Sequence, residues 1–317
     1  MRGRERERER ERENVPPGLG KPVRGRGTVV IHANPPQFQL VLCSLGRAFL
    51  RDKRVVGFWS WELESLPDVW VDAMRYVDAL EVPSEFVRQI LRRYTDKDCT
   101  CIPHAVPAPT RRKAVWARDG VIRCLYVFDA GSSWERKNPL AALRAFALAF
   151  APGEAELTFK VSNAGTERGS YATFREQCAA VPGVRIVTEN LTPGEMEELY
   201  VRHDVYLSLH RSEGYGLTLR EAMLHGLHVV ATGWSANMEF MQGELCHAVP
   251  FKLVQATFNR GPCKGLKTRW AEADTDAAAA ILRDVRRAIL NAAAGPRQDA
   301  PANADEVAGQ HLPGVFG

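Results

Sequence analysis

The sequence predicts an α/β protein in which helices alternate with the strands of doubly wound parallel sheets, and two observations carry that prediction. From Thr28 onward, short apolar runs rich in Val and Ile alternate with longer stretches in which apolar residues recur with a helical period. Polar residues and glycines follow directly after the apolar runs. Ligands bind outside the carboxyl ends of strands in such sheets, so the pattern also predicts where a site would lie.

The first part of the chain is expected to hold about three strands and three helices. The strands are expected at residues 28–33, 55–59 and 79–82, and the helices at 38–50, 68–76 and 84–93. A complete doubly wound domain has about six strands. We therefore expect this half to be incomplete, through truncation of the chain or a mistaken initiation site.

The second part of the chain is expected to hold a complete sheet. Its strands are expected at 121–128, 156–161, 184–187, 205–209, 228–231 and 246–249. Its helices are expected at 139–150, 168–180, 193–202, 217–225 and 275–293. This alternation is typical of parallel sheets with helical connections.

The most informative segment is 209–221, which reads Leu-His-Arg-Ser-Glu-Gly-Tyr-Gly-Leu-Thr-Leu-Arg-Glu. It leads from a strand into a helix through a turn that contains Gly214 and Gly216, which let the backbone turn tightly and approach a ligand. The free N–H groups of the first helical turn suit a diphosphate. Glu213 lies in the turn, and Glu221, about two turns into the helix, can accept both hydroxyls of a ribose. The segment predicts a nucleotide-sugar site; two surface glutamates at an ordinary helix start are the alternative.

Three further segments accompany this motif: 128–139 (Phe-Asp-Ala-Gly-Ser-Ser-Trp-Glu-Arg-Lys-Asn-Pro), 232–240 (Thr-Gly-Trp-Ser-Ala-Asn-Met-Glu-Phe) and 57–63 (Gly-Phe-Trp-Ser-Trp-Glu-Leu). Together the four segments resemble those of the retaining glycosyltransferases of family 4, among the glycosyl transferases group 1. The resemblance covers most of residues 28–290. It implies the GT-B architecture of two facing Rossmann-like domains and transfer of a hexosyl group, with retention, from a nucleotide-sugar donor to a hydroxyl of a glycan or lipid-linked glycan.

The resemblance and the composition together predict four parts of the chain. Residues 1–27 are expected to form a disordered leader, because the alternating Arg and Glu residues offer no apolar face to bury. Residues 28–107 are expected to form a partial acceptor-side domain, and residues 108–295 the donor-binding domain. Residues 296–317 are expected to be a flexible tail.

The resemblance also assigns roles to donor-side residues. Glu213 would hold sugar hydroxyls and stabilise positive charge at the anomeric carbon. Lys137 would stabilise the departing diphosphate, with Lys160 as a second cation. Arg136 is a weaker candidate, because the neighbouring position matches the family's basic residue. The remaining donor-binding candidates are Glu221, Gly214, Tyr215, Gly216, Leu217, Asn190 and His210.

One departure from the family concerns the diphosphate. The family's usual arginine at the end of the first donor strand is replaced here by the Gly131-Ser132 region. The diphosphate would therefore meet one cation fewer, unless Lys160 or Arg211 compensates.

On the acceptor side, His32 and Glu62 are expected across the cleft, where an acceptor hydroxyl must be oriented or deprotonated. Many relatives have a histidine near the position of Trp61, and His32 is equally well explained as a structural histidine. Phe58, Trp59 and Trp61 could stack on a sugar, but aromatic residues that end a strand are more often part of the core.

The charge distribution argues against a nucleic-acid-binding protein. The formal charge is +4, but nine of the 42 basic and five of the 38 acidic residues lie in 1–27, which leaves 33 of each sign after Gly27. A folded nucleic-acid-binding domain is expected to carry the basic excess itself. An arginine-rich binding arm in the leader is the remaining alternative.

No cofactor or metal is expected, since the nucleotide sugar is a substrate. Cys99 and Cys101 with His104 lack a fourth ligand at zinc-like spacing. The pairs Asp96/Asp98 and Asp274/Asp276 fit a metal-binding Asp-x-Asp pattern. We interpret both as structural, because the first pair follows a helix and the second precedes one, where aspartate caps backbone N–H groups.

Seven scattered cysteines favour reduced thiols in the cytoplasm. No apolar run approaches the roughly 18 residues of a membrane span, and the N-terminus lacks the apolar core of a signal peptide. The expected location is the cytoplasm, with peripheral contact at the inner face of the membrane as an option. A nucleotide-sugar-binding protein without transferase activity, or an enzyme fragment, is the functional alternative.

Overall fold

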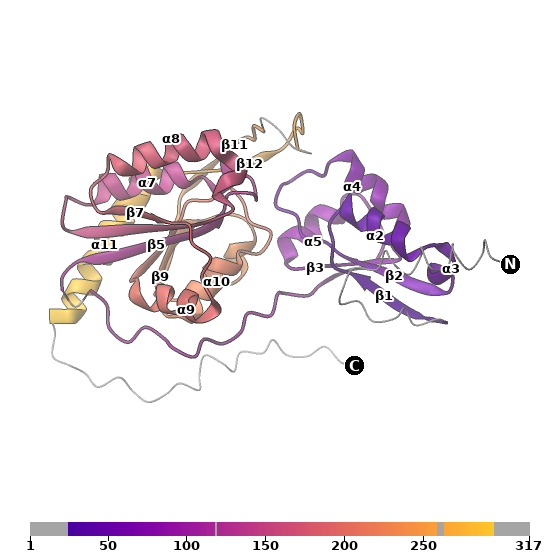
Figure 1. Cartoon of the computed structure of the whole chain (residues 1–317), viewed down its shortest axis with the longest axis horizontal. Helices are drawn as coiled ribbons and strands as arrows, with labels where there is room; N and C mark the ends of the chain where they lie inside the picture. Colours follow the sequence, from indigo (N-terminus) through magenta and orange to yellow (C-terminus); the bar gives the residue numbers. More distant parts are fainter. Residues whose placement is uncertain (1–24, 118, 259–262, 295–317) are drawn as a thin grey trace.

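The described residues form an α/β structure with two parallel sheets and one antiparallel hairpin (Figure 1). This computed structural model describes residues 25–117, 119–258 and 263–294. A four-stranded sheet has the order β1-β2-β3-β4, and a six-stranded sheet has the order β10-β9-β8-β5-β6-β7. The predicted leader and tail lie almost wholly outside the described residues.

The four-stranded sheet contains β1 (Gly27–Ile31), β2 (Lys53–Phe58), β3 (Ala79–Val82) and β4 (Cys99–Cys101). The first three are the predicted strands. The fourth strand, β4, was not predicted, so the expectation of about three strands in this half was wrong and the sheet has four. The sequence signal missed β4 because three residues, Cys-Thr-Cys, carry no apolar run, and pairing with β3 is what makes them a strand.

The helices of this half are α2 (Gln37–Leu45), α3 (Arg47–Leu50), α4 (Asp68–Ala73), the 3-10 turn η1 (Met74–Tyr76) and α5 (Glu85–Leu91). The predicted helix 38–50 is broken at Gly46, whose φ of 76° does not fit a right-handed helix. Figure 1 shows α2, α4 and α5 on one side of the sheet. They bury a core around Phe38, Trp59 and Trp70.

The six-stranded sheet contains β5 (Ile122–Asp129), β6 (Ala155–Ser162), β7 (Val184–Val187), β8 (Val205–Ser208), β9 (His228–Thr232) and β10 (Cys246–Val249). All six were predicted, to within one or two residues at their ends. The chain runs outward from β5 to β7, returns to β8 beside β5, and continues outward to β10. The direction of winding therefore reverses between β5 and β8, which is where ligands bind in open parallel sheets.

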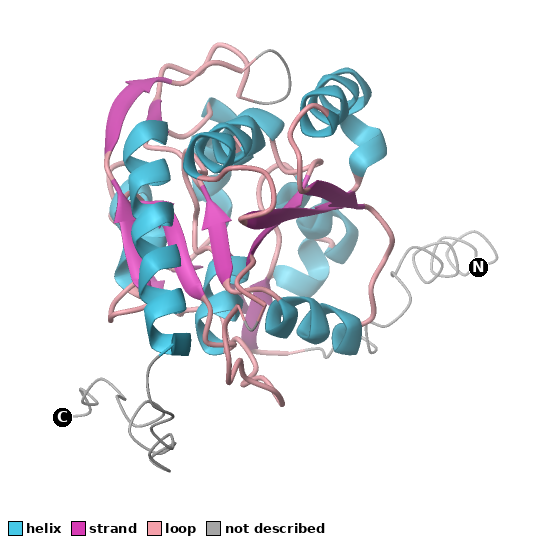
Figure 2. Ribbon diagram, turned by 90° about the vertical axis from the view of Figure 1, so that its left-hand side faces the viewer, coloured by secondary structure: helices cyan, strands magenta, loops and turns pink. Residues whose placement is uncertain are grey.

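The helices around this sheet are α6 (Trp134–Lys137), α7 (Pro139–Ala149), α8 (Arg168–Ala179), α9 (Pro193–Arg202), α10 (Leu217–Leu224) and α11 (Thr275–Ala294). Two 3-10 turns, η2 (Ala164–Glu167) and η3 (Ala236–Glu239), complete it. Only α6 among the helices was not predicted. Figure 2 shows α11 along the strands, immediately before the grey C-terminal trace, and its buried face belongs to the same core as α7.

The hairpin of β11 (Phe251–Gln255) and β12 (Arg269–Ala273) was not predicted. It follows β10 in sequence, but Ala256 and Trp270 are buried in the core of the four-stranded sheet. The hairpin therefore connects the last part of the chain to the first core.

Candidate active site

The centre of the site is Glu213, in the loop after β8. Its Oε1 lies 2.6 Å from Lys137 Nζ and 3.3 Å from Arg136 Nη1. Both cations belong to α6, which follows β5. The side chains of Glu213, Lys137 and Arg136 are only 12%, 14% and 5% exposed. The two loops at the switch point thus meet in a buried charge cluster, which we call the Glu213 cluster.

The electrostatics keep Glu213 ionised. Burial raises its pKa, but Lys137 and then Arg136 lower it to about 2. Burial lowers the pKa of Lys137, and the Glu213 carboxylate opposes that effect. Burial also lowers the pKa of Arg136, but the carboxylates of Glu62 and Glu213 raise it by more, so the pKa is raised overall. Arg136 is therefore a permanent cation.

Glu62 joins the cluster from the other half of the chain. Its Oε1 lies 3.5 Å from Arg136 Nη2, and its backbone oxygen accepts a hydrogen bond from the Ser212 hydroxyl. Arg136 also donates to Ser212 O and Ser132 O, at 2.7 and 2.9 Å. The weaker sequence candidate, Arg136, is thus the most extensively bonded member of the site.

Steric constraints explain why positions 214 and 216 of the motif are glycines. A Cβ on Gly214 would lie 2.6 Å from Trp61 O, and Gly214 O accepts from Ser84 Oγ at 2.7 Å. The backbone of the first half of the chain is therefore the group that approaches Gly214 closely in the structure. Gly216 has a φ of 93°, which side chains rarely adopt, and forms the N-cap of α10.

Tyr215 and Leu217 lie on either side of this N-cap. The Tyr215 hydroxyl donates to His104 O at 3.2 Å, and its ring meets the His104 ring edge-on at 5.2 Å. Leu217 is 45% exposed. His32 is exposed and stacks on Phe58 at 4.7 Å, while Phe58 also contacts His104 at 5.5 Å. The four rings thus form a chain of contacts that runs from Tyr215, in the loop that carries Glu213, through His104 and Phe58 to His32.

His210 lies beneath the loop. Its ring nitrogens lie 3.0 Å from Ser208 Oγ and 3.1 Å from Asn237 Oδ1, and burial lowers its pKa to about 4. The ring is neutral at pH 7 and supports the loop from within. Trp59 and Trp61 are buried against Trp70, at ring distances of 5.6 and 4.6 Å, which confirms the core interpretation for both.

Three further candidates lie outside the cluster. Glu221 is half-buried and accepts a 2.7 Å hydrogen bond from the Tyr200 hydroxyl of α9. Lys160 is buried, and its Nζ lies 3.4 Å from Ser162 Oγ at the end of β6. Asn190 is exposed in the loop after β7. Lys160, near the end of β6, and Asn190, after β7, lie toward the carboxyl edge of the sheet that carries the cluster. The roles of all three residues remain predictions.

Arg211 was considered in the sequence analysis as an additional cation for the diphosphate. In the structure its side chain contacts other protein groups. Its Nε lies 2.6 Å from Glu272 Oε2, and its guanidinium lies over the Trp270 ring at 5.0 Å. Glu272 was not predicted as part of the site, because β12 gave no sequence signal. Glu239 was also missed as a contact between halves: its carboxylate accepts from the N–H groups of Glu85 and Phe86 at the start of α5.

Comparison with known proteins agrees with this architecture. Residues 125–256 match the family model described as glycosyl transferases group 1. The chain is similar to S. aureus TarM, solved as a mutant with fondaparinux, α-GlcNAc-glycerol and UDP (TM-score 0.55, 12% identity, 77% of this chain and 46% of that chain). It is also similar to the trehalose 6-phosphate synthase of Burkholderia multivorans (TM-score 0.59, 13% identity, 86% of this chain and 67% of that chain). The chain has the GT-B fold.

A third similar GT-B structure is the pneumococcal O-GlcNAc transferase GtfA with UDP and GlcNAc (TM-score 0.52, 14% identity, 84% of this chain and 53% of that chain). The chain thus spans about half the length of TarM and of GtfA. No curated protein matches the chain in sequence.

The two Asp-x-Asp motifs that fit a metal-binding pattern have structural explanations. Asp274 Oδ1 accepts from the N–H groups of Asp276 and Ala277, both at 3.0 Å, and so caps α11 as predicted. Asp98 precedes β4 and lies 3.6 Å from Arg54. In the described ranges no three His, Cys, Asp or Glu residues are grouped as metal ligands. No described helix has the length and apolar character needed to span a bilayer.

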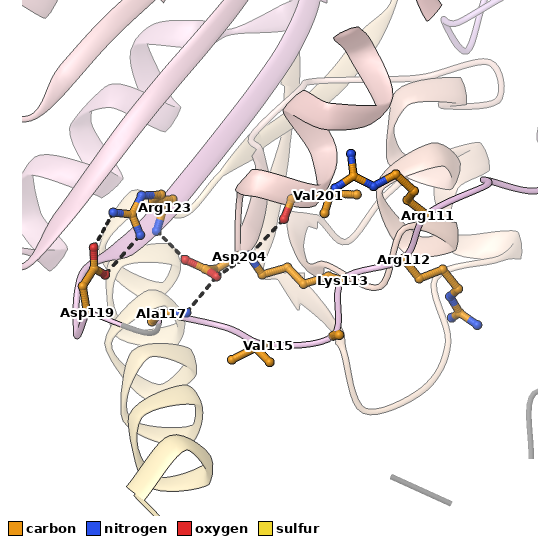
Figure 3. A pocket seen from close by; sticks show the side chains of 10 residues that line it. Arg111, Arg112, Lys113, Val115, Ala117, Asp119, Arg123, Val201 and Asp204 are labelled. Atoms are coloured by element: carbon orange, nitrogen blue, oxygen red, sulfur yellow. Dashed lines mark hydrogen bonds and ion pairs between the residues drawn. The ribbon is translucent and has the colours of Figure 1, made fainter. Parts of the chain in front are cut away.

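A cavity of about 480 Å³ lies at the opposite edge of the six-stranded sheet, around Asp204 at the start of β8 (Figure 3). Asp204 Oδ1 lies 2.8 Å from Lys113 Nζ, and the carboxylate accepts from the N–H groups of Ala117 and Arg123. Figure 3 shows these groups converging on Asp204. This cavity is where the connection between the two sheets is attached, and it is remote from the Glu213 cluster.

Proposed function

We propose that the protein is a glycosyltransferase that moves a hexosyl group from a nucleotide-sugar donor to a hydroxyl of a glycan or lipid-linked glycan. The observation that carries the proposal is the Glu213 carboxylate, held between Lys137 and Arg136 at the switch point of the sheet. In this proposal the transfer retains the anomeric configuration and needs no metal ion.

The geometry suits the charges that develop in such a reaction. When the bond from the anomeric carbon to the diphosphate oxygen breaks, the nucleoside diphosphate leaves with the bonding pair and gains negative charge. Lys137 and Arg136 stabilise that charge. Glu213 holds sugar hydroxyls and faces the positive charge at the anomeric carbon.

The acceptor is placed by the first half of the chain. The acceptor oxygen forms the new bond on the face from which the diphosphate departs, and its proton passes to a departing phosphate oxygen. Glu62, already 3.5 Å from Arg136, and His32 orient the acceptor.

The similar proteins support the donor class. The TarM and GtfA structures were solved with UDP, and a trehalose-6-phosphate structure from E. coli was solved with UDP-2-fluoro glucose. We therefore place UDP-hexoses first among the donors. Cytoplasmic location belongs to the proposal and is supported by the seven free thiols. Contact at the inner face of a membrane is a further part of the proposal.

A second candidate is a nucleotide-sugar-binding protein without transferase activity. It is favoured by the four-stranded first sheet and by the coverage of about half of TarM.

A panel of nucleotide sugars, screened with the purified chain by thermal shift and then by release of nucleoside diphosphate with and without glycan acceptors, tests both candidates. Binding with acceptor-dependent release supports the transferase. Binding without release under any acceptor supports the second candidate. If no nucleotide sugar raises Tm or binds by calorimetry, both are wrong.

A further inference from the structure

The hairpin β11–β12 is joined by an ion pair to the loop that carries Glu213. Glu272 of β12 lies with Oε2 2.6 Å from Arg211 Nε. Arg211 stands two residues before Glu213, in the loop after β8. Its Nη1 donates to Glu135 O in α6 at 2.6 Å, one residue before Arg136. The Arg211 side chain therefore bonds both the hairpin and the helix that supplies the cations.

Glu272 completes the connection with its other oxygen. Asn138 Nδ2 lies 3.4 Å from Glu272 Oε1 and also donates to Leu209 O at 3.1 Å. Asn138 is the residue that ends α6. Both ends of the short helix segment 134–138 are thus bonded to the Arg211–Glu272 pair or to the loop after β8.

Backbone hydrogen bonds connect the same three segments. The Arg211 N–H donates to Arg136 O at 2.7 Å, and the Ala271 N–H donates to Arg211 O at 2.9 Å. Trp270, beneath the Arg211 guanidinium, is 2% exposed and belongs to the core of the four-stranded sheet. Arg211 is consequently fixed to the first half of the molecule as well as to the second.

Helix α6 needs such support. It has only four residues, between Ser133 with a φ of 70° and Asn138 with a φ of 49°. A single helical turn is unstable on its own, because nucleation orders several residues for few hydrogen bonds. Contacts from outside must therefore set the orientation of Arg136 and Lys137.

We propose that Arg211 and Glu272 are positioning residues, which hold α6 against the loop after β8 and so set the distances of Arg136 and Lys137 from Glu213. Neither residue touches donor or acceptor in this scheme. The effect on turnover rests on the proposed function, whereas the effect on α6 does not.

The kinetic test uses Glu272→Gln and Arg211→Lys. Because misplacement of about 1 Å can cost about 100-fold in rate, we expect kcat to fall about 10-fold to 100-fold in each, with the donor KM changed less than about 3-fold. Arg211→Lys keeps the charge but loses the forked donors that reach Glu272 and Glu135 O together. The double variant Arg211→Lys/Glu272→Gln should be no slower than the worse of the two single variants, because the two residues act as a unit.

Arg269→Gln is the matched control. Arg269 is also on β12 and pairs with Glu64 at 3.0 Å, on the outside of the hairpin and away from α6. It should leave kcat unchanged. If it lowers kcat as much as Glu272→Gln does, the hairpin has a general structural role and the proposal is wrong.

Amide hydrogen exchange provides a readout that needs no substrate. Peptides that cover 134–138 and 209–213 should exchange faster in Glu272→Gln than in the wild type, and at the wild-type rate in Arg269→Gln. A wild type with no turnover contradicts the proposed function while this measurement still decides the positioning role. Unchanged exchange in Glu272→Gln overturns the inference.

Discussion

Glu213 and Lys137 form an ion pair of 2.6 Å although 76 residues separate them in the sequence. They come from the two loops that flank the switch point, where β5 and β8 are neighbours. A diphosphate that binds here would compete with Glu213 for Lys137 and Arg136. Several of the effects that we expect from substitutions at the site follow from this ion pair.

Glu213→Gln and Lys137→Met should separate catalysis from binding. If, as proposed, both groups act on charge that develops in the transition state, turnover should fall about 100-fold to 1,000-fold, while donor affinity changes far less. Nucleoside diphosphate release gives kcat, and calorimetry gives the donor Kd. Lys252→Met, at an exposed position of β11, is the control for loss of a lysine. Full turnover in both site variants would remove these residues from the reaction.

The pKa of Glu213 predicts acid sensitivity. Its pKa in the folded protein is about 2, whereas an unfolded glutamate titrates near about 4.3. A depressed pKa contributes stability that is complete above the unfolded pKa and is lost as the pH falls toward the folded pKa. The free energy of unfolding should therefore drop between about pH 5 and pH 2, and less steeply in Glu213→Gln. Urea titrations at several pH values measure this, and parallel curves for the two proteins would contradict it.

Gly214→Ala should disturb the contact between the two halves. Its Cβ would lie 2.6 Å from Trp61 O, a backbone atom that cannot move unless the loop after β2 moves with it. Overpacking of this kind costs about 1–3 kcal/mol, and turnover should fall as Ser84 and Glu62 shift. Gly194→Ala is the control, because a Cβ there meets nothing within 4 Å. Equal Tm values for the two variants would show that the approach of Trp61 is not tight in solution.

Glu221→Ala should weaken nucleotide binding. If its carboxylate accepts the ribose hydroxyls, the loss is about 1.5–3 kcal/mol for hydrogen bonds to a charged group. The Tyr200 hydroxyl, 2.7 Å from Glu221 Oε2, orients that carboxylate, so Tyr200→Phe should show a smaller loss of the same sign. Calorimetry with UDP measures both. Equal affinity of wild type and Glu221→Ala would remove the ribose role.

Turnover, or nucleotide binding where no acceptor is known, should survive excess EDTA. Lys137 and Arg136 supply two positive charges beside Glu213, which is the work that a divalent ion performs in metal-dependent transferases. The check compares initial rates with and without chelator. Complete loss that manganese or magnesium restores would contradict metal-independent catalysis.

Much of the fold follows from local patterns. Of the ten parallel strands in the described part of the chain, the apolar runs predicted nine, and the motif 209–221 predicted the turn from β8 into α10. Such runs are recognisable because a buried parallel strand needs several consecutive apolar residues. Strand β4, helix α6 and the β11–β12 hairpin are too short, or too mixed in polarity, to carry that signal.

The sequence also provided the two principal site candidates: Glu213 through the motif 209–221, and Lys137 through the resemblance of its segment to the family's basic residue. Only the tertiary structure decided which cations accompany Glu213. Arg136 points into the cluster, Arg211 bonds to Glu272, and Lys160 bonds to Ser162. Neighbouring residues on a helix differ in direction by about 100°, and the direction of α6 depends on contacts from β12, more than 130 residues later in the chain. No local pattern contains that information, because it arises from packing between distant segments.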